Sequence, residues 1–70
     1  MKKLYCIKRS SGIIKDVNSF FSKEEAAKWY LSERRQYPGI FKDSVLVELS
    51  ELCSYGYEDI KQTAGVRASE

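Results

Sequence analysis

The sequence contains no histidine, and its 70 residues include only two cysteines and one proline. The lack of histidine removes the commonest acid–base residue near neutral pH. Cys6 and Cys53 stand far apart, with no second cysteine pair or histidine nearby, whereas a structural zinc site needs four ligands. We therefore expect no metal site and no cofactor within one chain, and two small buried thiols in a reducing compartment.

Long apolar runs and an excess of one charge are also missing. The apolar stretch that begins at Leu4 ends at Lys8, which is too short for the core of an export signal. No segment approaches the roughly 18 apolar residues of a membrane span. The net charge of +2 is too small to indicate nucleic-acid binding by itself. These features predict a cytoplasmic protein that makes no contact with a membrane.

Groupings that carry catalysis are absent from the sequence as well. An enzyme needs a positioned nucleophile, an acid–base pair or a metal. The sequence has no phosphate-binding loop or dinucleotide fingerprint, its carboxylates are scattered, and Cys6 has no base beside it. We therefore predict that the chain is not an enzyme.

The clearest signal that is present marks one helix. Ser22 is a good N-cap, Glu25 completes a capping box, and Pro38-Gly39 ends the pattern, which predicts a helix over residues 23–36. We expect four aromatic residues in and around this helix to belong to the core. They are Phe20, Phe21, Tyr30 and Phe41.

Alternating apolar residues predict strands over residues 4–8, 13–17 and 45–52, the first two joined as a hairpin. The expected fold is α+β, a β-β-α-β domain with a three-stranded antiparallel sheet in the order 2-1-3. One helix covers one face, and the other face stays uncovered. Residues 1–56 form this single domain. Residues 57–70 form a short helix closed by Gly65 or a tail, with 66–70 loose in either case.

The aromatic residues are more numerous than a core of this size requires. Trp29 falls outside the apolar arc of the predicted helix, and Tyr55 and Tyr57 are also hard to place inside. Tryptophan, tyrosine and arginine are enriched at interface hot spots. One interpretation is a contact surface for a larger protein, rimmed by Arg34 and Arg35. The other has Trp29 lying along the sheet edge, with the two tyrosines folded back onto it. The first interpretation predicts a non-enzymatic protein-binding module.

Nucleic-acid binding is the alternative function. Aromatic residues on an open sheet with basic neighbours resemble, in outline, the stacking surface of RNA-binding β-sheet domains. A third interpretation is a homodimer that buries the open sheet face. The residues of the nucleic-acid platform would be Tyr5, Lys3, Lys8, Arg9 and Lys15.

Three local patterns carry a resemblance to a group of small proteins. They are the hairpin around Ser11-Gly12, the helix start Phe21-Ser22-Lys23-Glu24-Glu25-Ala26 and the run Val45-Leu46-Val47. In these patterns, its length and its lack of catalytic groups, the chain resembles small phage-encoded accessory proteins, such as inhibitors of host RNA polymerase and some anti-CRISPR proteins. The resemblance implies an inhibitor or modulator that docks on a host or defence protein in the host cytoplasm. The slightly basic charge departs from the acidic, DNA-mimicking members.

Overall fold

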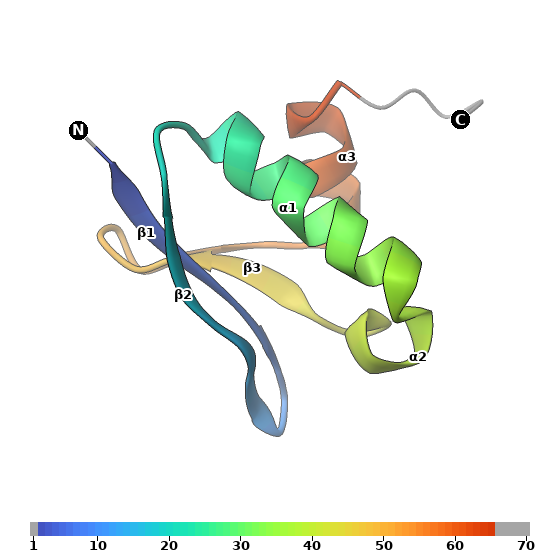
Figure 1. The fold of residues 1–70 in the computed structure, drawn as a ribbon. Helices are drawn as coiled ribbons and strands as arrows, with labels where there is room; N and C mark the ends of the chain where they lie inside the picture. Colours follow the sequence, from blue (N-terminus) through green and yellow to red (C-terminus); the bar gives the residue numbers. More distant parts are fainter. Residues whose placement is uncertain (1, 66–70) are drawn as a thin grey trace.

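The computed structural model describes residues 2–65, which form a four-stranded antiparallel sheet and three helices (Figure 1). The α+β class and the antiparallel sheet are confirmed. The segment 66–70, expected to be loose, lies outside the described residues. The elements in chain order are β1 (Lys3–Arg9), β2 (Gly12–Phe20), α1 (Lys23–Gln36), α2 (Pro38–Phe41), β3 (Val45–Glu48), β4 (Cys53–Tyr55) and α3 (Tyr57–Thr63).

The sheet has the order β2-β1-β3-β4, so the prediction of three strands was wrong by one. The predicted third strand, residues 45–52, is in fact β3 followed by a turn. The turn contains Leu52 at a φ of 54°, and β4 then pairs back along β3. Leu49 and Leu52 extend the apolar pattern of β3 into this turn, and for this reason the turn was not recognised in the sequence. The predicted positions of β1 and of its two neighbours are confirmed.

Strand β2 is the longest strand and forms one edge of the sheet. It pairs with β1 through a hairpin whose Gly12 has a φ of 131°, a conformation that side-chain-bearing residues rarely adopt. Tyr5 lies opposite Asn18 and Ile7 lies opposite Lys15, so β2 contains an extra residue between these pairs. Such a bulge bends the strand and increases its twist.

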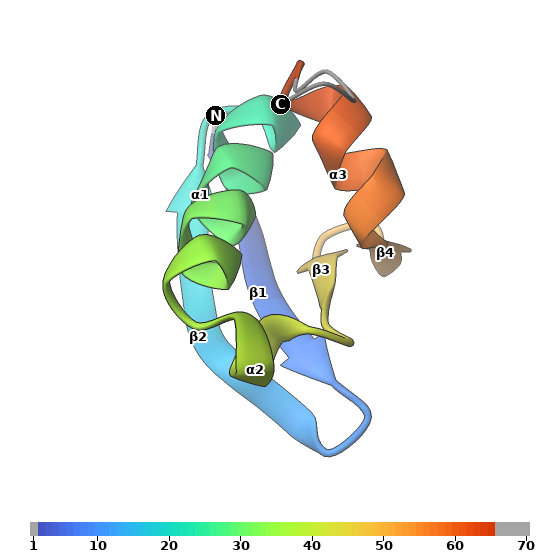
Figure 2. The same ribbon diagram turned by 90° about the vertical axis from the view of Figure 1, so that its right-hand side faces the viewer.

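Helix α1 spans the predicted residues, and its start shows why. The Ser22 side chain accepts a hydrogen bond from the Glu25 backbone N–H (3.2 Å), and the Glu25 carboxylate accepts one from the Phe21 N–H (3.2 Å). Figure 2 shows α1 and α3 side by side, both in front of the sheet. The two helices therefore cover the same face.

The core lies between the sheet and these helices. Tyr30 and Phe41 are buried as predicted, and Phe20 packs partly buried against the core, but Phe21 is 65% exposed. Phe21 precedes the helix cap and lies outside the core, with Lys2 Nζ 5.0 Å from its ring centre. The core also extends into α3. Of the two alternatives for the segment after residue 56, a short helix or a tail, the structure has the helix. Its buried members are Tyr5, Ile7, Ala26, Ala27, Tyr30, Phe41, Leu46 and Ile60.

Hydrogen bonds fix the short helix α2 to α1. The Tyr30 hydroxyl donates to the Ser44 carbonyl oxygen (2.9 Å) and accepts from Arg34 Nη1 (3.2 Å). Arg34 Nη1 also lies 3.2 Å from the Lys42 carbonyl oxygen, and the Ser44 hydroxyl donates to the Phe41 carbonyl oxygen (2.6 Å). This network closes one end of the core.

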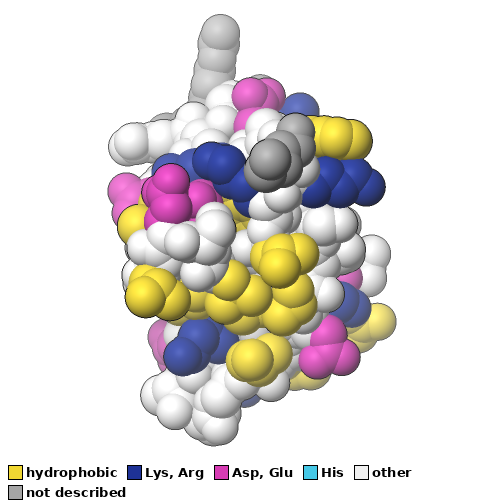
Figure 3. Space-filling view, turned by 90° about the vertical axis from the view of Figure 1, so that its left-hand side faces the viewer, with side chains coloured by type: hydrophobic (Ala, Val, Ile, Leu, Met, Phe, Trp, Pro, Cys, Tyr) yellow, Lys and Arg dark blue, Asp and Glu magenta, His cyan; other side chains and the backbone are white. Residues whose placement is uncertain are grey.

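The described residues leave the second face of the sheet uncovered. Leu4 and Val17 are half-exposed there, since each is next in its strand to a member of the Tyr5–Asn18 pair on the helix-covered face. Hydrophobic side chains gather in the middle of this side of the molecule (Figure 3). Cys6 is buried on β1 and Cys53 is half-buried on β4, and both thiols are free. The expectation of two buried thiols is therefore correct for Cys6 alone.

Candidate functional site

The two edges of the sheet are the first places to look for a binding site, because an edge strand has backbone groups that no neighbouring strand pairs. Strand β4 has three residues and passes through Gly56 directly into α3. Strand β2 has nine residues, most of them exposed, and its hairpin end extends beyond the helices (Figure 1). The long accessible edge is therefore β2.

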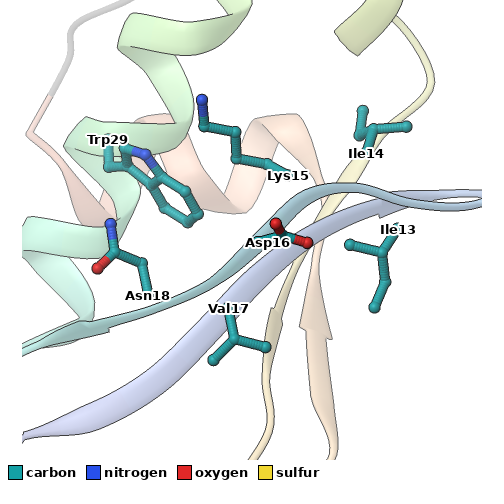
Figure 4. A pocket seen from close by; sticks show the side chains of 7 residues that line it. All are labelled: Ile13, Ile14, Lys15, Asp16, Val17, Asn18 and Trp29. Carbon is teal, nitrogen blue, oxygen red and sulfur yellow. The ribbon is translucent and has the colours of Figure 1, made fainter.

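A shallow hollow with a volume of about 570 Å³ follows this edge. Figure 4 shows the side chains of β2 fanning to both sides of the strand, with the Trp29 indole of α1 on the same side as Lys15 and Asn18. The side chains that line the hollow are Ile13, Ile14, Lys15, Asp16, Val17, Asn18 and Trp29.

Trp29 forms the wall of the hollow on the helix side. Its ring lies 5.1 Å from that of Phe20, centre to centre, and it packs half-buried against the core. These contacts hold the indole in place while part of it faces the hollow (Figure 4). A rigid aromatic ring beside unpaired strand backbone is a suitable contact for the side chain of an added strand.

The two charged residues of the hollow differ in their surroundings. Lys15 Nζ lies 3.2 Å from Glu33 Oε1 on α1, so its charge is paired. Asp16 is exposed, and the ion pairs found among residues 2–65 do not include it. The hollow therefore presents one uncompensated negative charge next to apolar and aromatic surface.

The residues expected to form a single contact surface occupy separate places. Trp29 stands over β2, whereas Tyr55 belongs to β4 at the opposite edge of the sheet. Lys23 Nζ lies 3.7 Å from the Tyr55 ring centre, and Arg34 Cζ lies 3.7 Å from that of Tyr57. The structure thus brings Arg34 and Tyr57 together but keeps Trp29 apart from both tyrosines.

The alternative interpretation of these aromatics is half right. Trp29 does lie along a sheet edge, but the tyrosines fold onto cationic side chains and not onto it. Arg34 is engaged by its hydrogen bonds to Tyr30 and to the Lys42 carbonyl oxygen. Arg35 is exposed in the last turn of α1.

The expected nucleic-acid platform lacks its aromatic residue. Tyr5 is fully buried on the helix-covered face, where its hydroxyl donates to Glu48 Oε1 (3.0 Å). Burial, followed by the hydrogen bond to the Glu48 carboxylate and its charge, raises the pKa of Tyr5 far above its ordinary value. A base could not reach this ring, so the placement of Tyr5 on the open face was wrong. The reason is that the helices cover the face that carries Tyr5 and Ile7.

The basic residues of that platform are also spread out. Lys3 Nζ lies 3.7 Å from Glu48 Oε2, and Lys15 pairs with Glu33. Lys8 is exposed and Arg9 half-buried at the hairpin end of β1. These four side chains do not surround an accessible aromatic ring.

Sequence reasoning missed the β2 side chains of the hollow, apart from Lys15. Two signals could have identified them: the predicted sheet order, which makes this strand an edge, and the place of Trp29 outside the apolar arc of α1. Combining these signals requires knowing which side of α1 faces β2, which depends on tertiary packing.

Comparisons with protein-family models, curated proteins and solved structures find no match. In the part of the chain that the structure describes, acidic and cysteine residues do not gather into a group that could hold a metal ion. None of the helices within residues 2–65 is both long and apolar enough to cross a bilayer.

Proposed function

We propose that this chain is a non-enzymatic protein-binding module that accepts an extended segment of a larger protein along β2. The observation that carries the proposal is the hollow in which Trp29 stands beside six consecutive residues of an edge strand. In strand addition, main-chain hydrogen bonds supply affinity, and pockets for alternate side chains supply specificity. An edge strand with one hollow beside it supports this mode of binding.

The dimensions of the hollow fit such a segment. Residues 13–18 would span about 20 Å if extended, at about 3.3 Å per residue. This length matches a strand of about six residues, which is typical of globular proteins. The bulge within this stretch limits continuous pairing, which favours a short docked segment over edge-to-edge aggregation.

The apolar face beside this edge enlarges the surface available to a partner. Leu4 and Val17 are half-exposed on the uncovered side of the sheet. Exposed apolar surface next to an open edge favours contact with a folded body as well as with one strand. An inhibitor or modulator of a host or defence protein, as the resemblance to phage accessory proteins implies, would use both.

The proposal is tested by placing a charge in the hollow. Val17→Lys adds an ammonium group beside the edge, a device that natural sheets use to prevent strand pairing. A tagged wild-type chain and this variant would be used to recover partners from bacterial lysate, and recovered proteins would be quantified by mass spectrometry. We expect recovery of a specific partner to fall about tenfold or more with Val17→Lys.

The matched control is Leu52→Lys, the same type of change at an exposed turn between β3 and β4. It should recover the partner as well as the wild type does. Circular dichroism would show that both variants fold. Equal recovery by the wild type and both variants would contradict docking at β2.

A further inference from the structure

The uncompensated carboxylate in the hollow defines what the docked segment should carry. Asp16 is exposed, while the neighbouring Lys15 is neutralised by Glu33 at 3.2 Å. The same hollow contains the indole of Trp29, and the face of an indole ring attracts cations. A carboxylate and an indole that line one hollow form a favourable environment for a cationic side chain.

We propose that the segment accepted by β2 carries an arginine or a lysine in the hollow, with its charge on Asp16 and its stem along Trp29. This inference rests on the proposed function. Arginine suits the site better, because its planar guanidinium stacks on aromatic rings and pairs with a carboxylate through two hydrogen bonds. Either residue can also lay its aliphatic stem along the apolar side chain of Ile14, which points to the same side of β2 as Trp29 (Figure 4).

The charges of the hollow also disfavour two other occupants, a second copy of this chain and a nucleic acid. If a second copy paired its β2 antiparallel to this one about a two-fold axis at the centre of the hollow, at residue 15 or 16, Lys15 would face Lys15 or Asp16 would face Asp16. Like charges directly opposite each other in a strand pair are destabilising. A nucleic-acid backbone would place phosphates near the free carboxylate of Asp16, which repels them. A cationic protein segment meets neither obstacle.

The test uses three synthetic peptides of about nine residues, acetylated and amidated, that alternate threonine and valine around one central guest residue. The guests are arginine, leucine and glutamate. Each peptide is titrated into ¹⁵N-labelled full-length protein and followed by NMR. We expect the arginine peptide to shift the backbone amides of residues 13–18 and the Trp29 indole N–H. Its dissociation constant should be about fivefold below that of the leucine peptide, and the glutamate peptide should bind most weakly.

Charge reversal at the hollow makes the test specific. In Asp16→Lys the order should invert, with glutamate binding more tightly than arginine. Asp43→Lys is the matched control, because it makes the same charge change at an exposed position just before β3. This control should keep the preference for arginine.

Each other result overturns a defined part of the account. Equal binding of all three peptides at β2 would overturn the cationic guest and leave strand addition in place. Shifts of the β2 amides that depend on protein concentration alone would assign the edge to a second copy, and shifts caused by an oligothymidine and by no peptide would assign it to nucleic acid. No shift at β2 with any probe would overturn the proposed function itself.

Discussion

The two edges of this sheet differ in length and in what lies beside them. Strand β4 is three residues long and leads straight into α3, whose Ile60 is fully buried in the core. Strand β2 is nine residues long and is bordered by a hollow and by the half-buried Trp29. In residues 2–65, the C-terminal helix thus anchors one edge and the other faces solvent. This difference between the edges is why docking of a partner is proposed at β2 and not at β4.

The largest expected effect concerns the anchored edge. Ile60→Ala removes a fully buried side chain between α3 and the core, and we expect the free energy of unfolding to fall by about 2–5 kcal/mol. Chemical denaturation monitored by circular dichroism measures this change. Ile60→Val, with an expected loss of about 0.5–1.5 kcal/mol, keeps the test readable if the alanine variant does not fold.

The matched change at the open edge is Ile13→Ala. Ile13 is 57% exposed on β2, so its truncation should cost less than about 1 kcal/mol. A loss as large as that of Ile60→Ala would mean that the two edges are equally integrated into the core, and the contrast between them would fail.

The second effect concerns the central strands that hold the two edges together. The buried hydroxyl of Tyr5 on β1 bonds Glu48 on β3, and burial is the main cause of the raised pKa of Tyr5. The unfolded tyrosine ionises near pH 10 while the folded one stays neutral. The stabilisation is therefore complete below pH 10 and is lost as pH rises above it, by up to about 1.4 kcal/mol per pH unit.

Urea denaturation from pH 9 upward would measure this loss. Tyr5→Phe should be less stable than the wild type at neutral pH, because Glu48 loses a hydrogen-bond donor, and it should show a shallower alkaline slope. Ile7→Val, in the same strand and core, should lower stability equally at every pH. If Tyr5→Phe kept the wild-type slope, the Tyr5 hydroxyl would not be buried in the folded state as described.

The smallest effect concerns the turn that creates the anchored edge. Leu52 has a φ of 54° and is 87% exposed, so its backbone is strained and its side chain contributes little burial. Leu52→Gly should raise the free energy of unfolding by about 0.5–1 kcal/mol, measured by chemical denaturation. Leu52→Ala, which keeps the Cβ atom, should give no such gain. A loss of stability with glycine would show that this turn is not strained.

The parts of the fold that could be predicted are those determined by residues close together in the sequence. Helix α1 was predicted to the residue because Ser22, Glu25 and Pro38 act within a few positions of its ends. The split between β3 and β4 was missed because its turn lacks glycine and asparagine and contains Leu52 in their place. Strand β2 continues to Phe20, since Asn18 and Ser19 pair with β1 although their types favour turns.

The candidate site was only partly predictable. Trp29 was identified because it falls outside the apolar arc of α1, which is a local property. The residues that lie beside Trp29 were not identified. Tyr55 and Tyr57 were grouped with it because they are also aromatic, but Tyr55 lies at the opposite edge of the sheet and both rings contact cationic side chains. Tyr5 is buried because the helices cover its face of the sheet. Which face they cover depends on tertiary packing, and the alternation of side chains on β1 does not predict it.

The most direct test of docking at β2 is amide hydrogen exchange of the chain alone and in complex with a partner recovered from lysate. Docking at β2 predicts slower exchange in the complex for backbone amides of residues 13–18 and unchanged exchange for Cys53–Tyr55. Slower exchange confined to β4, or no change at either edge, would contradict it.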